Sequence, residues 1–537
     1  MKEILIDLYD FNVIYCLRDY CIYESTDRVK NRDIILKKMG LDSKTYCWSK
    51  LDDYLLQIES LALQIIKNNS TERIVLYSEF MRESYSNGDF PKENLQYFIS
   101  IDDASVWIQK MLVNNENYSN SVQVQDLLLL YELFFVYDEI EKKKEFSVNN
   151  LDYICDYTEL LEPIDNHQLD EFIDNTALYF NAVKIEESEL INQQLKEKLK
   201  KRKLLPNLIF EKNNDVLKNA VGFTYRDIDT FIERLKEIIN SDVEPRCLFN
   251  KHHVRINKQR LVLEMTKYIP EDNVCSIIRI LSINENVNLN SNITVRDLEI
   301  RCIFERDNNL SFGVNTIIKS LLMIKSMSIC GHFPKTLNIT KEKNDKFVSA
   351  QSDFSTYFSY YVGDQLEYFG YLLPKAHDGT IKVEIKKIML SSKILDFNDI
   401  DVLALDVRNK CLLNLELKYF KGKVYYESVM TDGMDNKKYC NFMKRQMILE
   451  KNMSEILTNL FGVVDTDGYS VVPIVVTSRV NVNHKEVDEF SFEEFLQLLA
   501  DDKLKDVLKE KKYIEANNYH EEEMRLHISV SEEADGR

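Results

Sequence analysis

The sequence predicts a two-part protein, in which a large, mostly α-helical N-terminal region precedes a C-terminal α/β domain. Three observations support this fold class. The chain has 537 residues, 45% of them hydrophobic, which is too long for a single core. Only 13 Gly and 8 Pro interrupt it, which favours long helices. In the last third the pattern changes to helix, three strands, helix and strand, which indicates a central mixed sheet flanked by helices.

Changes in composition and the position of a helix-stopping residue predict four segments along the chain. A mixed-charge stretch ends at Pro206, which is a typical helix stop and suggests a boundary there. The aromatic-rich pattern that starts near Asp353 marks a second boundary. We therefore expect a helical N-terminal domain (1–205), a helical domain compatible with a winged-helix-like unit (206–345), the α/β domain (346–500) and a charged tail (501–537).

The N-terminal two thirds show apolar spacing typical of amphipathic helices. Thr224 followed by Asp227 indicates a helix N-terminus, because a Thr hydroxyl caps free backbone amides and an acidic side chain favours the first turn. That helix is expected to end near Ile239. The other predicted helices are Leu51–Lys67, Asp102–Leu112, Val124–Glu141 and a helix pair within Val295–Ser328.

The C-terminal third combines apolar runs of strand length with two helical patterns. Residues Ile400–Lys418 contain two such runs separated by the polar turn Arg408-Asn409-Lys410, which predicts a β-hairpin. The remaining predicted elements are the helix Phe354–Leu373, the strand Ile381–Met389, the helix Asn436–Leu460, the strand Ser470–Thr477 and the helix Phe490–Leu499.

Charge and cysteine usage restrict the functional classes. The net charge of −19 argues against a protein whose whole surface attracts nucleic acid. The stretch 406–451 is an exception, with ten basic side chains against six acidic ones. The ten cysteines lack paired spacing, which is typical of reduced core residues in a cytoplasmic protein. We find neither a signal-peptide pattern nor an apolar run long enough to cross a bilayer, so no membrane association is expected.

The hairpin carries the residues that suggest chemistry. Successive strand side chains alternate between faces, so Glu416 and Lys418 should point one way while Leu415 and Leu417 enter a core. If Asp401 lies across the hairpin from Glu416, two carboxylates and one ammonium share a small patch. Such a patch can hold a hard divalent cation and act on a phosphodiester. Taken alone, Glu-x-Lys on a strand is more commonly a surface salt bridge.

The order of elements, with Asp401 and Glu416-Leu417-Lys418 on neighbouring strands, resembles the PD-(D/E)xK superfamily of restriction-endonuclease-like nucleases. It looks most like the branch with Mrr-type and phage-defence enzymes. The resemblance covers roughly 353–499 and departs from the nominal pattern in having Ile400 where a Pro is usual. It implies that Asp401 and Glu416 bind Mg²⁺, for which Mn²⁺ would substitute, together with the backbone carbonyl of Leu417. Lys418 would orient or polarise the attacking water.

The same resemblance extends to further candidates. Glu367, in the first helix of the domain, is a candidate third metal ligand. Asp399 shares a strand face with Asp401 and would support the site, as would Gln446 on the later helix. The candidate nucleic-acid contacts are Lys444, Arg445 and Lys421.

These observations lead to the expectation of a Mg²⁺-dependent endonuclease that cuts double-stranded DNA in defence against foreign DNA. Cleavage of both strands would need two sites, so a homodimer or larger assembly is expected. A partner ATPase or another defence protein is compatible with the large N-terminal region. Two alternatives remain open: a catalytically silent binding protein with a nuclease fold, and an acidic partner-binding protein that mimics DNA.

Overall fold

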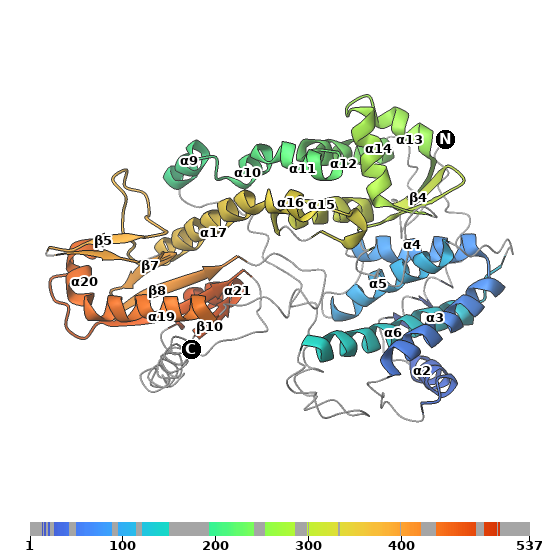
Figure 1. Cartoon of the computed structure of the whole chain (residues 1–537), viewed down its shortest axis with the longest axis horizontal. Helices are drawn as coiled ribbons and strands as arrows, with labels where there is room; N and C mark the ends of the chain where they lie inside the picture. The colour runs from blue at the N-terminus through green and yellow to red at the C-terminus, as the bar shows by residue number, and fades with distance from the viewer. Residues whose placement is uncertain are drawn as a thin grey trace, which may run out of the picture.

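The structure is a computed structural model of the 537-residue chain. It describes residues 13, 16–17, 20–21, 26–41, 50–87, 95–113, 121–149, 193–240, 253–284, 298, 300–330, 333–391, 393–397, 399–419, 436–478, 488–501 and 503–504. Figure 1 shows a helical N-terminal part and a sheet-containing C-terminal part. The predicted mixed α/β architecture with a helical N-terminal region is therefore confirmed. No described helix has the length and apolar character needed to cross a membrane.

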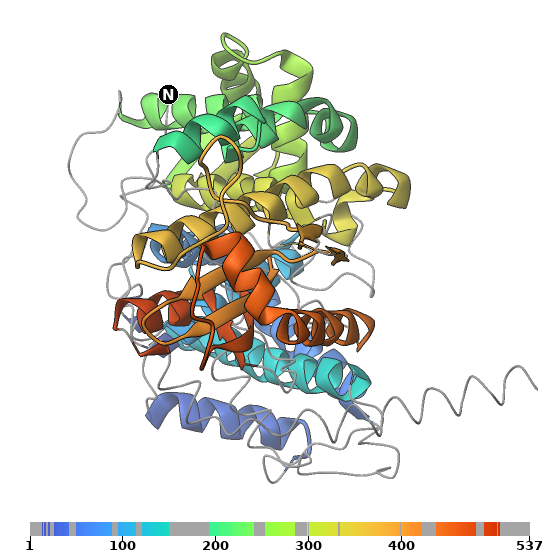
Figure 2. The same cartoon turned by 90° about the vertical axis from the view of Figure 1, so that its left-hand side faces the viewer.

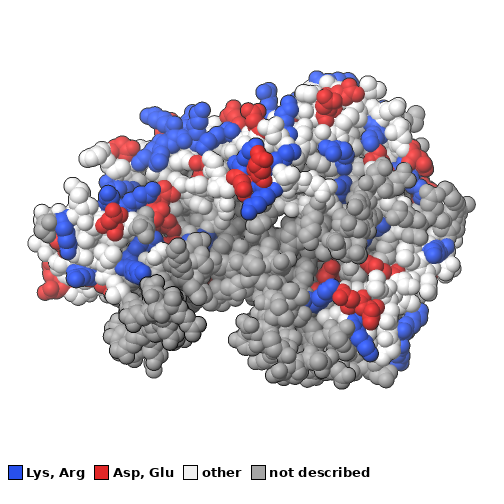
Figure 3. All heavy atoms as spheres, in the orientation of Figure 1, with Lys and Arg blue, Asp and Glu red and all other residues white. Residues whose placement is uncertain are grey.

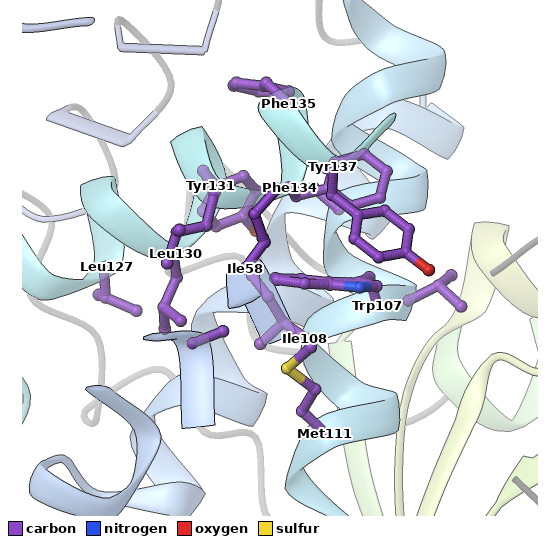
Figure 4. Close-up of a cluster of buried hydrophobic side chains, with 14 of the residues drawn as sticks. Ile58, Trp107, Ile108, Met111, Leu127, Leu130, Tyr131, Phe134, Phe135 and Tyr137 are labelled. Atoms are coloured by element: carbon purple, nitrogen blue, oxygen red, sulfur yellow. The ribbon is translucent and has the colours of Figure 1, made fainter. Parts of the chain in front are cut away.

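The N-terminal part is a bundle of helices around an aromatic core. Trp107 lies at its centre, with ring centroids 5.7 Å from Phe134 and 5.4 Å from Tyr137 (Figure 4). Large buried aromatic side chains contribute much of the apolar burial that stabilises such a core. The three helices predicted in this part are present, and each is longer than predicted. The bundle consists of α2 (Thr26–Lys38), α3 (Leu51–Asn68), α4 (Thr71–Asn87), α5 (Leu95–Leu112) and α6 (Val124–Asn149).

The middle part contains strands as well as helices. As predicted, Thr224 begins a helix: the Asp227 amide donates to Thr224 Oγ1 at 3.1 Å, and the Thr224 amide donates to Asp227 Oδ2 at 2.8 Å. The helix pair predicted within Val295–Ser328 is wrong in its first half, where two short strands precede a single helix. The helices are α10 (Pro206–Lys212), α11 (Asn214–Val221), α12 (Tyr225–Asn240), α13 (Lys258–Met265), α14 (Glu271–Leu281) and α15 (Val314–Cys330).

A four-stranded sheet in the order β1-β4-β3-β2 accompanies these helices. Asp307 and Asn308 link β3 to β4 with positive φ angles of 47° and 63°, a conformation that Asp and Asn tolerate in tight hairpin turns. The order helix, strand, two helices and hairpin is compatible with the winged-helix-like expectation, which stays a prediction. The strands are β1 (His253–Asn257), β2 (Ser282–Ile283), β3 (Ile303–Arg306) and β4 (Asn309–Gly313).

The C-terminal part has a mixed sheet in the order β10-β9-β8-β7, in which β7 and β8 are antiparallel and the other pairs are parallel. Helix α17 covers one face of the sheet and α19 the other (Figure 1). The strands are β7 (Val402–Asp406), β8 (Cys411–Lys418), β9 (Ser470–Thr477) and β10 (Asp488–Ser491), and the helices are α17 (Val348–Tyr368), α19 (Asn436–Lys451), α20 (Met453–Phe461) and α21 (Phe492–Ala500).

The predicted strand Ile381–Met389 does not join this sheet as a regular strand. Only β5 (Lys387–Met389) is extended, and it pairs with β6 (Ile394–Asp396) in a separate two-stranded ribbon. Glu384 has a positive φ of 53°, which interrupts the pleat before β5 begins. Its amide and that of Ile385 still bond to the carbonyls of Asp401 and Ile400, so the segment lies beside the start of β7.

Two cores sandwich the sheet because strand side chains alternate. Leu413, Leu415 and Leu417 enter the core shared with α17 and α21. Leu412, two positions before Asn414 and four before Glu416, enters the core shared with α19 and α20. The pattern therefore directs Glu416 to the α19 side, at the end of β8.

Helix α9 (Gln193–Lys201) belongs to this C-terminal core although it lies some 150 residues earlier in the chain. Leu195, Leu199 and Leu204 are buried with side chains of α17. Figure 2 shows the green helices that begin with α9 on the far side of the gold helix α17 from the orange sheet. The boundary expected at residue 205 thus falls between α9 and α10, and α9 packs on the α/β part.

Candidate active site

The β7–β8 hairpin places the central carboxylates opposite one another. Val402 pairs with Leu415, and the next position in the same register sets Asp401 against Glu416. The amide of Leu417 donates to Asp401 Oδ2 at 2.6 Å, which holds that carboxylate at the end of β8. Asp401, Glu416 and Lys418 therefore lie together, as the hairpin pattern predicts.

Two cations hold the Glu416 carboxylate. Lys418 Nζ lies 2.5 Å from Glu416 Oε1, and an Arg445 nitrogen contacts Oε2. Arg445 comes from α19, which packs on the same face of the sheet. Glu416 is only 7% exposed, so its charge is stabilised by these partners rather than by water.

The environment disfavours a negative charge on Asp401 beside that of Glu416. Burial, and after it the charge of the nearby Glu416 carboxylate, raise the pKa of the Asp401 carboxyl to about 7, against the opposing effects of the Leu417 amide and Lys418. Burial, and then the charge of Glu384, also raise the pKa of Asp399. A group of acids whose pKa values are raised in this way is stabilised by a proton or by a cation.

Glu384 is a neighbour of the site that the sequence did not single out. Its amide donates to the Asp401 carbonyl at 2.9 Å, and its Oε1 accepts from the Thr356 hydroxyl of α17 at 2.6 Å. Its left-handed backbone is unusual for Glu, and such conformations are concentrated at functional sites. The sequence signal is weak, because a single Glu after an apolar alternation looks like a surface strand residue.

The supporting candidates are distributed differently. Asp399 Oδ1 is buried without a hydrogen-bond partner among the described residues. Gln446 lies beside the site, where it accepts from Asn414 at 3.1 Å and donates to the Val471 carbonyl at 3.0 Å, so it joins α19 to the sheet. Lys444 is exposed on the outer side of α19, and Lys421 lies outside the described residues.

Glu367 is not brought to the carboxylate pair. It forms an ion pair with Lys375 at the C-terminal end of α17. Thr356, which contacts Glu384 beside Asp401, is eleven residues earlier in the same helix, about 16 Å along its axis. Leu372, soon after Glu367, bridges to Leu405 near the far end of β7. Glu384 therefore lies closer to Asp401 than the predicted third ligand.

The donor types present fit a hard divalent cation. Within the described ranges, no three His, Cys, Asp or Glu side chains are grouped closely enough to hold a metal ion by themselves. Mg²⁺ commonly uses only one or two protein carboxylates, with water and substrate phosphate completing its shell. Asp401 and Asp399 are oxygen donors of this kind, and the described residues supply no hydrogen-bond donor to the buried Oδ1 of Asp399. Glu416 would become a further donor if Lys418 and Arg445 released it.

The arrangement can therefore gather anionic oxygens around a cation beside a lysine and an arginine. A purely structural ion cluster would explain the Glu416 contacts but not the neighbouring Asp401, whose ionised form the fold disfavours. Comparison with known proteins finds no matching family model, no matching curated protein and no matching solved structure.

Proposed function

We propose that the C-terminal part is a Mg²⁺-dependent nuclease that hydrolyses phosphodiester bonds. The observation that carries this proposal is the partly buried Asp401 held opposite Glu416, with Lys418 and Arg445 on the same patch. Buried acids with raised pKa values beside basic side chains are typical of catalytic sites. The resemblance to PD-(D/E)xK nucleases supports the same activity.

Asp401 and Glu416 would hold the metal, with the Leu417 carbonyl as a third donor. When bound, Mg²⁺ would supply charge neutralisation and a water of lowered pKa. Lys418 and Arg445 would release Glu416 and bind the anionic oxygens of the substrate, since both are donors suited to phosphate. Lys418, the compact ammonium, would orient the attacking water.

Double-stranded DNA is the substrate that the resemblance favours, and defence against foreign DNA the matching role. A homodimer, or a larger assembly with a partner ATPase or other defence protein, would allow both strands to be cut. This role would be carried out in the cytoplasm. The DNA substrate, the defence role and the assembly rest on the likeness of the motif to the family.

A catalytically silent nuclease-fold protein is the second candidate. The contacts of Glu416 with Lys418 and Arg445 favour it, because they satisfy the carboxylate without any metal. In such a protein the sheet would serve only to display a binding surface. An acidic DNA mimic, suggested by the net charge of −19, would bind a basic partner and not DNA itself.

A cleavage assay separates these candidates. We expect the full chain to degrade plasmid DNA with Mg²⁺ or Mn²⁺ and not with EDTA. Asp401→Asn and Glu416→Gln should each reduce the rate at least about 100-fold, because they remove charge at the reacting centre. Glu367→Gln is the matched control, since that carboxylate lies about 16 Å along α17 from the Thr356 contact, and it should keep near-normal activity.

Equal cleavage by wild type and Asp401→Asn would reject the assigned site. Complete lack of cleavage of duplex DNA, single-stranded DNA and RNA, in a protein that still binds Mg²⁺, would favour the silent protein. Metal binding is read independently as a rise in melting temperature with Mg²⁺, which Asp401→Asn should abolish.

A further inference from the structure

Helix α9 and the residues after it carry the densest run of positive charge among the described helices. Between Gln193 and Lys203 there are six basic side chains and one acidic one, Glu197, in a chain with a net charge of −19. Figure 3 shows blue side chains gathered over the position that α9 occupies in Figure 1. We call this set the α9 cation cluster; its members are Lys196, Lys198, Lys200, Lys201, Arg202 and Lys203.

The packing of α9 leaves these charges on the outside. Leu195 and Leu199, four residues apart, are buried in the C-terminal core and hold one face of the helix against it. Lys200, Lys201 and Lys203 are exposed and Lys196 is partly exposed. No ion pair joins any of these four lysines to another of the described residues.

Local stability explains only part of the cluster. Lys198, Lys200 and Lys201 lie in the last turn of α9, where cations interact favourably with the helix dipole. Lys196 and Lys200 are four residues apart on the helix, a spacing at which like charges repel. Lys203 takes a positive φ of 57° just after the helix, a position that glycine usually occupies. The helix dipole therefore accounts for the lysines of the last turn but not for Lys196 or Lys203, whereas an external anionic partner would account for all of them.

The cluster is tied to the carboxylate site through α17. Arg202 donates to the Tyr360 hydroxyl at 2.7 Å. Thr356, one turn earlier and about 6 Å along the same helix, donates to Glu384, whose amide bonds to the Asp401 carbonyl. One rigid helix thus supports both the cations and the loop beside the carboxylates.

A second connection runs over the surface. Lys198 contacts Asp378 at 3.5 Å and the Thr380 hydroxyl at 2.5 Å. The chain leaving Thr380 carries the exposed side chains of Lys382 and Lys386, and Lys386 acts electrostatically on Asp399. Exposed lysines therefore occur along the surface between α9 and the edge of the site, with the acidic residues Asp378 and Glu384 among them.

We propose that the α9 cation cluster docks the phosphodiester backbone of a nucleic-acid duplex, whose scissile bond enters the site of Asp401 and Glu416. The proposal rests on the proposed nuclease function and specifies where the substrate lies outside the reacting centre. Lys and Arg contacts to phosphates position a duplex without reading its sequence.

The composition of the exposed face favours nucleic acid over an acidic protein. All the exposed residues of α9 are polar, because its two leucines are both buried. Protein interfaces usually have an apolar or aromatic core, whereas binding to the phosphate backbone needs only cations. A polar, lysine-rich helix without an apolar centre matches the second kind of surface.

The test is a binding measurement with the full chain in EDTA, where metal-dependent cleavage is stopped. A fluorescent duplex of about 30 bp, roughly 100 Å long, is titrated at several salt concentrations. The variant replaces Lys196, Lys200, Lys201 and Lys203 by Gln, which keeps helix propensity and the buried leucines. A matched control replaces four exposed lysines remote from α9, namely Lys37, Lys38, Lys50 and Lys236.

We expect the α9 variant to bind at least about tenfold more weakly and to lower the slope of log Kd against log salt by about 3 to 4, close to one for each lost phosphate contact. The remote control should keep wild-type affinity and slope. Parallel titrations with DNA duplex, RNA duplex and single-stranded DNA identify the source of the phosphodiester backbone, and polyglutamate tests for simple anion attraction.

Equal affinity and slope for wild type and the α9 variant would overturn the docking proposal, as would equal competition by polyglutamate and duplex. The cleavage assay tests the nuclease proposal separately from the docking proposal. A wild-type protein that binds through α9 but never cuts would reject the nuclease proposal and retain the docking surface. If the wild-type protein cuts and the α9 variant binds and cuts equally well, the nuclease proposal is retained and the docking proposal is rejected.

Discussion

At the scale of single residues, the decisive feature is Asp401. Its carboxyl is held beside Glu416 by the Leu417 amide, and burial with the Glu416 charge raises its pKa to about 7. An unfolded Asp titrates near 3.8, so the folded state binds an extra proton between these two values. The metal-free fold therefore tolerates Asp401 best when it is neutral.

This predicts an unusual pH dependence. Because the folded pKa is raised, the Asp401 contribution to the unfolding free energy is fully present below pH 4 and is lost as the pH rises to about 7, amounting to about 2–4 kcal/mol. Hydrogen exchange of β7 and β8 at pH 5 and pH 8 in EDTA, corrected for the intrinsic pH dependence of exchange, measures it. Asp401→Asn should be the more stable protein at pH 8. A variant with the same pH slope as wild type would contradict the assignment.

At the scale of elements, α9 and α17 form one packing unit with the sheet. Leu199 is fully buried in the core that also contains Tyr357 and Leu366 of α17. The contribution of a buried leucine includes both its transfer from water and the cavity that its removal leaves. The stability of the C-terminal sheet thus depends on a helix distant in sequence.

Leu199→Ala should therefore destabilise the C-terminal part by about 3 kcal/mol. Leu263→Ala on α13, where the side chain is 67% exposed, is the control and should change stability by less than about 0.5 kcal/mol. Hydrogen exchange of β7 and β8 is the measurement, because a multidomain chain does not unfold in one step. Unchanged protection of these strands in Leu199→Ala would show that α9 is dispensable for the core.

At the scale of the whole molecule, buried polar contacts join the N-terminal bundle to the middle part. Glu83 of α4 is completely buried and accepts from the amides of Asn315 and Thr316 at the start of α15, at 3.0 and 2.9 Å. A carboxylate at a helix N-terminus satisfies free amides and interacts favourably with the helix dipole. A Cβ atom at Gly313 would lie 2.1 Å from Glu83, so only glycine permits this approach.

Glu83→Ala should loosen this junction, because it leaves buried amide donors without acceptors at a cost of about 3 kcal/mol. Limited proteolysis should then cut between the two parts sooner than in wild type. Asp53→Ala, at an exposed position of α3, is the control and should leave the digestion pattern unchanged. Identical proteolysis of Glu83→Ala and wild type would show that Glu83 does not hold the two parts together.

Local pattern alone determined much of this protein. The hairpin, its register and the shared face of Glu416 and Lys418 follow from strand alternation and a short turn, which leave little freedom between positions 401 and 418. The helices of the N-terminal region and the Thr224 cap follow in the same way, since their signals lie within a few residues.

Only tertiary packing decided the rest. The contact of Arg445 with Glu416, the approach of Glu384 and the separation of Glu367 from the carboxylate pair depend on how α17 and α19 pack against the sheet. The packing of α9 on the C-terminal core joins segments far apart in the sequence, and no local sequence pattern predicts this contact. Strand spacing sets which side chains share a face, whereas apolar burial between distant segments sets which faces meet.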